Sequence, residues 1–149
     1  MSTKGTFLNR LKYGKHKFHN GVETYAMPHI NPDGTIGGWV AESAVVSETC
    51  YVAPEAEVFE YAQVLGDATL LSTASASGFA VIKDKAILDD ESHVTDDALI
   101  EGSALIAGVT HLGGRSHVDW GIVDTDQMHN YLLQLQNQKI EKQKNVRVV

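Results

Sequence analysis

Aliphatic side chains recur at every sixth residue through the middle of the chain. The positions of this series are Val40, Val46, Val52, Val58, Val64, Leu70, Ala76, Ile82, Leu88, Val94, Ile100, Ile106, Leu112 and Val118. Small residues recur with the same spacing from Ala44 to Ser116. Since 43% of the chain is hydrophobic, chance gives such a run with a probability of roughly one in ten thousand or less. The chain is therefore built on a six-residue repeat.

The six-residue spacing excludes an α-helix, because helices repeat every 3.6 residues and coiled coils every seven. Within each hexad the neighbours of the aliphatic residue point the opposite way, as they do in a β-strand. An acidic residue, a glycine or a proline stands two positions after nearly every aliphatic residue, and these types suit corners. The corner positions are Glu42, Glu48, Pro54, Glu60, Gly66, Gly78, Asp84, Asp90, Asp96, Gly102, Gly108 and Gly114. Each hexad is thus predicted to be a short strand and a corner, with the aliphatic and small residues facing inward.

This pattern resembles the hexapeptide repeat of left-handed parallel β-helices, in which three hexads form one triangular coil. The resemblance implies an all-β fold, a triangular solenoid of about 4–5 coils, which we assign to residues 39–123. A left-handed turn departs from the usual right-handed crossover, so the handedness rests on the resemblance alone. Ala76 stands where a large core residue is due, and we expect Phe79 to fill the space.

Residues 1–38 are predicted to form an N-terminal arm and a β-hairpin cap. Two alternating runs, Lys15–His19 and Val22–Ala26, are joined by Asn20-Gly21. Asn-Gly between alternating runs is the strongest short signal for a hairpin. The basic and aromatic run Lys15–His19 is interpreted as a solvated strand face.

The hairpin leads into the motif Gly37-Gly38-Trp39 at the start of the repeat. This motif, together with the repeat, resembles short hexapeptide-repeat proteins of bacteriophages and prophages. The resemblance implies a phage-derived protein, either a virion component or a factor that interacts with the host. We expect Trp39 to cover the open end of the solenoid, where core and strand edges need protection.

Beyond the repeat, Asp124 stands where the next aliphatic residue is due, so the solenoid is expected to end there. Residues 124–149 are predicted to be a C-terminal α-helix and tail. The helix has an apolar stripe that includes Met128, Leu132 and Leu135.

Outward-facing residues stack in columns eighteen residues apart, and two of the three faces are strongly apolar. Contiguous apolar surface calls for a cover, and members of the resembled family assemble as trimers with their prisms side by side. We therefore expect a homotrimer, with a protein or small-molecule ligand between subunits as a further possibility. The expected interface residues are Val45, Tyr51, Leu71, Val81, Ile87, Leu99 and Leu105 of the solenoid, with Met128, Leu132 and Leu135 of the helix.

The formal net charge is −7, and residues 38–125 alone carry −12. An acidic solenoid disfavours nucleic acid as a partner. No apolar run is long enough for a membrane span and no secretory signal opens the sequence, so we expect a cytoplasmic or virion location. The single cysteine, Cys50, occupies an inward small position and is expected to serve packing.

Histidines supply the only candidate chemistry. His93 and His111 lie one coil apart in the same outward column, and His117 lies one hexad further on. In a trimer such residues are candidate zinc ligands, an arrangement similar to that of the gamma-class carbonic anhydrases, although the spacing here departs from that family. His93 or His111 is also a candidate general base if the protein resembles the hexapeptide acyltransferases, which use acyl-CoA. A non-catalytic structural or binding module remains the favoured hypothesis.

Overall fold

The computed structural model describes residues 13–124. This part of the chain consists of β-strands joined by turns. The predicted C-terminal helix, with Met128, Leu132 and Leu135, and most of the N-terminal arm lie outside the described residues. Within residues 13–124 no helix is long and apolar enough to cross a membrane.

Three longer strands come first and a series of two-residue strands follows. The longer strands are β1 (Gly14–Lys17), β2 (Glu23–Ile30) and β3 (Ile36–Ala41). The short strands are β4 (Val45–Val46), β5 (Tyr51–Val52), β6 (Glu57–Val58), β7 (Gln63–Val64), β8 (Thr69–Leu70), β9 (Ser75–Ala76), β10 (Val81–Ile82), β11 (Ile87–Leu88), β12 (His93–Val94), β13 (Leu99–Ile100), β14 (Leu105–Ile106), β15 (His111–Leu112), β16 (His117–Val118) and β17 (Ile122–Val123).

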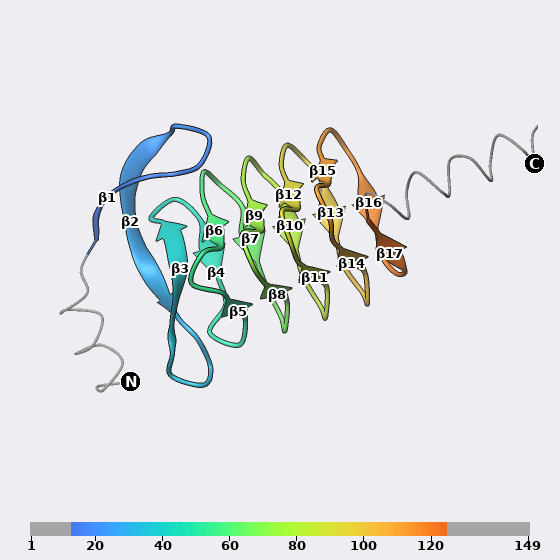
Figure 1. The fold of residues 1–149 in the computed structure, drawn as a ribbon, viewed down its shortest axis with the longest axis horizontal. Coiled ribbons are helices and arrows are strands. Elements are labelled where there is room, and N and C mark those ends of the chain that lie inside the picture. Colours follow the sequence, from blue (N-terminus) through green and yellow to red (C-terminus); the bar gives the residue numbers. More distant parts are fainter. Residues whose placement is uncertain (1–12, 125–149) are drawn as a thin grey trace, which may run out of the picture.

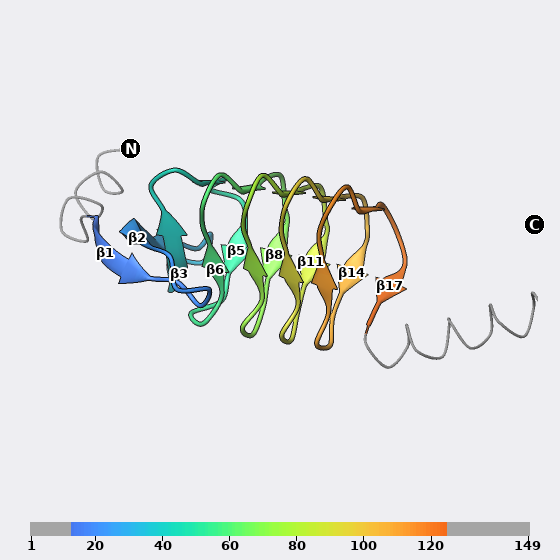
Figure 2. The ribbon, with the colours of Figure 1, turned by 90° about the horizontal axis from the view of Figure 1, so that it is seen from above.

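The short strands stack into three parallel sheets that form the walls of a solenoid of about five turns (Figure 1, Figure 2). Sheet A has the order β1-β2-β3-β6-β9-β12-β15, sheet B β4-β7-β10-β13-β16, and sheet C β5-β8-β11-β14-β17. Partners lie eighteen residues apart, as in Val81 with Leu99. The prediction of an all-β parallel solenoid is therefore confirmed.

The inward positions predicted from the sequence form the core. Every sixth residue from Val52 to Ile106 is fully buried, including Val64 and Ile82. The small positions from Cys50 to Ala104 are buried between them. Val46, Leu112 and Val118 lie on the end coils of the described solenoid and are only partly buried.

The last coil departs from the predicted register. Ile106 pairs with Val123, seventeen residues away, where earlier coils use eighteen. One residue is missing from the preceding corner, which turns at Gly121 with a φ of 85°. Val123 therefore takes the inward place that the six-residue spacing assigns to position 124. The sequence predicted that the solenoid ends where Asp124 interrupts this spacing, whereas in the structure the last repeat is one residue shorter and Val123 completes it.

The corners use residues in the left-handed backbone conformation, which costs an L-residue about 1–2 kcal/mol. From Glu60 onward the residue in this conformation is acidic or a glycine in every corner except that of Ser72. The Gly102 N–H donates to the Asp84 carboxylate of the coil before, at 2.9 Å. Asp90 and Asp96 accept hydrogen bonds from the N–H groups of Gly108 and Gly114 in the same way. Part of the acidic charge of the solenoid thus serves its corners.

The Gly37-Gly38 pair allows the backbone of β3 to pass close to β5 and to the turn between β5 and β6. A Cβ on Gly38 would lie 1.8 Å from the carbonyl oxygen of Ala56, and one on Gly37 would lie 2.2 Å from that of Val52. Beside them the buried Asn31 side chain accepts the Val52 N–H at 2.8 Å and donates to the Val52 carbonyl at 3.1 Å. Asn31 thereby replaces the strand that would otherwise pair with Val52.

Two aromatic residues do not take their expected places. Trp39 packs with a separate cluster on the outer side of sheet A, and not over the main core. Phe79 does not fill the space left by Ala76. Its side chain is 63% exposed and stacks on Tyr61 of the previous coil, with ring centroids 5.3 Å apart.

Candidate functional site

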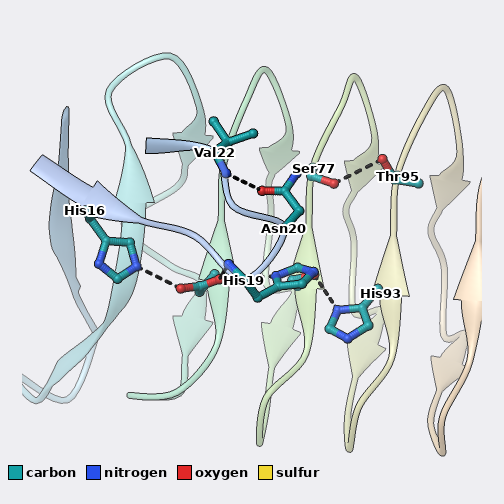
Figure 3. A network of polar contacts seen from close by, with 9 residues as sticks. His16, His19, Asn20, Val22, Ser77, His93 and Thr95 are labelled. Carbon is teal, nitrogen blue, oxygen red and sulfur yellow. Dashed lines mark hydrogen bonds and ion pairs between the residues drawn. The ribbon is translucent and has the colours of Figure 1, made fainter. Parts of the chain in front are cut away.

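The most densely connected polar cluster lies where the β1–β2 hairpin crosses the outer face of sheet A (Figure 3). The hairpin pairs antiparallel, with Gly14 opposite Ala26 and Lys17 opposite Glu23, and turns at Gly21. Its tip lies against the solenoid because Phe18 stacks on Phe59, with ring centroids 4.7 Å apart. Both phenyl rings are buried.

The carboxylate of Glu57 on β6 contacts two histidines of the hairpin. His16 Nε2 lies 2.8 Å from one carboxylate oxygen of Glu57. The other oxygen accepts the His19 backbone N–H at 3.0 Å and lies 3.2 Å from His19 Nδ1. The His16 ring also stacks on Trp39, with centroids 4.6 Å apart and planes inclined by 13°.

A row of three imidazoles continues from the hairpin tip along the solenoid. The His19 ring stacks on His93 at a centroid distance of 4.4 Å, and His93 meets His111 edge to face at 4.9 Å. His93 Nδ1 shares a 2.6 Å hydrogen bond with the hydroxyl of Ser75, which is only 1% exposed. The row therefore joins the hairpin to β9, β12 and β15.

The position of His93 lowers its pKa to about 4. Burial is the largest cause, followed by the positive charge that His19 and His111 acquire on protonation, and Glu57 opposes these effects weakly. Burial disfavours the charged imidazolium, and a like charge nearby does the same. His93 is consequently neutral at pH 7.

A cavity of about 310 Å³ opens beside His93 and is lined by His19, Glu55, Glu57, Thr73, Glu91 and His93. The carboxylates among these residues make the cavity acidic. A second, more apolar recess of about 280 Å³ lies between β2 and the first coil, around Met27 and Val40. Two members of the imidazole row, His19 and His93, line the first cavity.

The structure brings together two of the three predicted metal candidates. His93 and His111 are paired neighbours, but His117 lies on sheet B and contacts Glu101. The rings of His93 and His111 meet edge to face, with centroids 4.9 Å apart. Among residues 13–124, no three histidine, cysteine or carboxylate side chains are arranged to hold a metal ion.

Sequence reasoning missed the contribution of the hairpin. The run Lys15–His19 was interpreted as solvated, yet Phe18 is 2% exposed and His16 is half-buried. The one local signal is the alternation of Lys15 and Lys17 with His16 and Phe18, which is typical of a strand with one covered face. No local signal identifies Glu57 as the partner of the hairpin, because about forty residues separate them.

Two faces of the solenoid carry the predicted apolar columns. Tyr51, Leu71, Ile87 and Leu105 on sheet C are partly exposed. On sheet B, Val81 and Leu99 are partly exposed and Val45 is 51% exposed.

The chain matches no protein-family model, and neither a curated protein nor a solved structure is significantly similar to it.

Proposed function

We propose that this chain is a non-catalytic structural or binding module, a left-handed triangular solenoid that assembles as a homotrimer. The observation that carries the proposal is the pair of flat outer faces on sheets B and C with their apolar columns. Val81 and Leu99 on one face, and Ile87 and Leu105 on the other, retain exposed surface in the single chain. Contiguous apolar side chains on an outer face are typical of an interaction site.

A cyclic trimer places one such face against a different face of the next copy. A stiff prism with flat walls then offers grooves between subunits for a protein or small-molecule ligand. Together with the Gly-Gly-Trp motif, this supports a phage-derived virion component or host-interaction factor as the biological role.

Light scattering tests the assembly directly. We expect a mass three times the 16.2 kDa of the chain at micromolar concentration. Leu99→Glu and Ile87→Glu each place a charge on one apolar face and are expected to lower the mass. Val109→Glu, at a corner residue that is 60% exposed, is the matched control and should leave the mass unchanged. A wild-type monomer under these conditions contradicts the proposal.

Acyl transfer is the second candidate function, and the neutral state of His93 is the observation in its favour. A general base must be unprotonated at the working pH. Against it, His93 is engaged by Ser75 and covered by His19. A thermal-shift titration with acetyl-CoA decides the matter, since the structural proposal expects no stabilisation. Metal analysis of the purified protein tests the zinc alternative in the same way.

A further inference from the structure

We propose that the corner between sheets B and C lies at the threefold axis of the trimer, where Lys85 of each copy binds Asp67 of a neighbouring copy. This B–C corner consists of the residues that lead from each strand of sheet B to the next strand of sheet C, such as 83–86 between β10 and β11. The inference rests on the proposed trimer and deepens it, because it names the part of the chain that meets its own copies.

The hairpin decides which faces of the solenoid can meet a neighbour. It covers part of the outer face of sheet A, where His19 stacks on His93 (Figure 3), so sheets B and C are the faces with exposed apolar columns. In a cyclic trimer each copy uses one face for one neighbour and a second face for the other. With B and C in these roles, sheet A points outward and the B–C corner points to the axis. Because three sheets enclose each solenoid, neighbouring faces diverge away from the axis, and the closest contact falls at this corner.

Two residues of opposite charge are stacked at the B–C corner. Asp67 and Lys85 occupy the same position in successive coils, and the Asp67 N–H donates to the carbonyl of Asp84, the residue before Lys85, at 2.8 Å. Both side chains are exposed, and neither has a hydrogen bond or an ion pair in the part of the chain that the structure describes. The carboxylate of Asp84, in contrast, accepts the Gly102 N–H of its own chain. Asp67 and Lys85 are therefore available to a partner.

A threefold axis at this corner brings three copies of both residues together. Stacked strands lie about 4.8 Å apart, so three Asp67 carboxylates form one layer and three Lys85 ammonium groups form the next. Each Lys85 then lies beside Asp67 of a neighbouring copy, and this pairing fixes the height at which the copies meet. The corner between sheets C and A lacks such a pair, since its stacked charges, Glu55 and Glu91, are both acidic. Like charges that face each other across an interface disfavour it.

Trp120 stands in the last turn of the same corner and is 76% exposed. The chain passes there from β16 to β17, in the corner that is one residue shorter than the others. Residues that dominate binding energy are enriched in tryptophan and gather near the centre of an interface. At the axis, three Trp120 side chains lie together at the end of the interface and exclude water from it.

Three hydroxyl residues, one on each corner, allow the axis to be located by cross-linking. Ser103 lies on the B–C corner, Ser43 on the corner between A and B, and Thr73 on the corner between C and A, and all three are exposed. Each is replaced by cysteine in a separate variant, and the native Cys50 is buried. A short bismaleimide should link Ser103→Cys into dimers on a denaturing gel, with one chain of each trimer left unlinked. Ser43→Cys and Thr73→Cys should remain unlinked.

The result at each corner is compared with the mass of the same variant in solution. With a trimeric mass, linking at Ser43→Cys or Thr73→Cys in place of Ser103→Cys, or at none of the three, overturns the position of the axis and leaves the trimer intact. Equal linking of all three variants shows random collision and also overturns the position of the axis. A monomeric mass contradicts the trimer itself, and the inference falls with it.

Charge reversal tests the contact between Lys85 and Asp67. Lys85→Glu places like charges around the axis and should raise the chain concentration at half-assembly by at least about tenfold. Adding Asp67→Lys reverses both charges and should restore assembly. Arg115→Glu is the matched control, because Arg115 is stacked on Asp97 at the corner between A and B, which faces away from the axis. Wild-type assembly of Lys85→Glu, or no recovery in the double variant, contradicts the contact, as does an equal loss in Arg115→Glu.

Discussion

Alanine at Gly78 is expected to be among the most damaging small changes in the solenoid. Gly78 has a φ of 65°, and a Cβ there would lie 2.6 Å from the backbone nitrogen of Asp96 on the next coil. Neither partner moves freely: the Gly78 carbonyl accepts the Tyr61 N–H at 2.8 Å, and the Asp96 carbonyl accepts the Phe79 N–H at 2.8 Å. The clash is therefore between backbones held in register from both sides.

The loss of unfolding free energy in Gly78→Ala has two parts, backbone strain and overpacking. Alanine substitutions at glycines of other corners allow the two parts to be measured separately. The left-handed conformation costs alanine about 1–2 kcal/mol, partly offset by about 0.4–1 kcal/mol from the restricted unfolded chain. Overpacking adds about 1–3 kcal/mol. Gly114 has a φ of 59° and open space around its Cβ, so Gly114→Ala should lose only the free energy of the backbone strain. Gly66→Ala, in an interior coil with its nearest contact at 3.0 Å, lies between the two.

We therefore expect the loss of unfolding free energy to increase in the order Gly114→Ala, Gly66→Ala, Gly78→Ala, from about 1 to about 2–4 kcal/mol. Urea unfolding followed by circular dichroism at one fixed protein concentration measures it, since the assembly state affects apparent stability. If Gly78→Ala unfolds at the same urea concentration as Gly114→Ala, the close approach between coils does not determine the corner sequence.

Other predictions concern the core and the first coil, and the same urea assay checks each of them. The Ser92 hydroxyl is the one buried side-chain polar atom without a hydrogen-bond partner in residues 13–124, so Ser92→Ala should stabilise the protein by about 1 kcal/mol. Asn31→Ala leaves the N–H and carbonyl of Val52 unpaired and should cost about 2–3 kcal/mol. Leu88→Ala, at a fully buried position, should cost about 2–5 kcal/mol. A destabilised Ser92→Ala, or a neutral Asn31→Ala or Leu88→Ala, contradicts the corresponding argument.

Much of the candidate site was outside the reach of sequence reasoning. The six-residue spacing placed His93 and His111 in one outward column, and the structure pairs them. The same spacing placed Glu57 in that column, but it gave no information on the contacts of Glu57 with His16 and His19. A hairpin tip and a solenoid wall distant in sequence meet only through tertiary packing. The same holds for Phe79, whose outward direction is set by its corner and by the stacked ring of Tyr61.

Sequence alone determined the strand spacing and the inward residues, because each is a local consequence of one repeated pattern of aliphatic, small and corner residues. The parallel stacking was implied by the resemblance of that pattern to hexapeptide-repeat β-helices. The tertiary structure decided what the outer faces do. It folded the hairpin onto sheet A, buried Phe18 against Phe59, and set His93 between two imidazoles. It also shortened the last corner so that Val123 reaches Ile106. These features depend on contacts between distant segments, whose geometry no periodicity along the chain encodes.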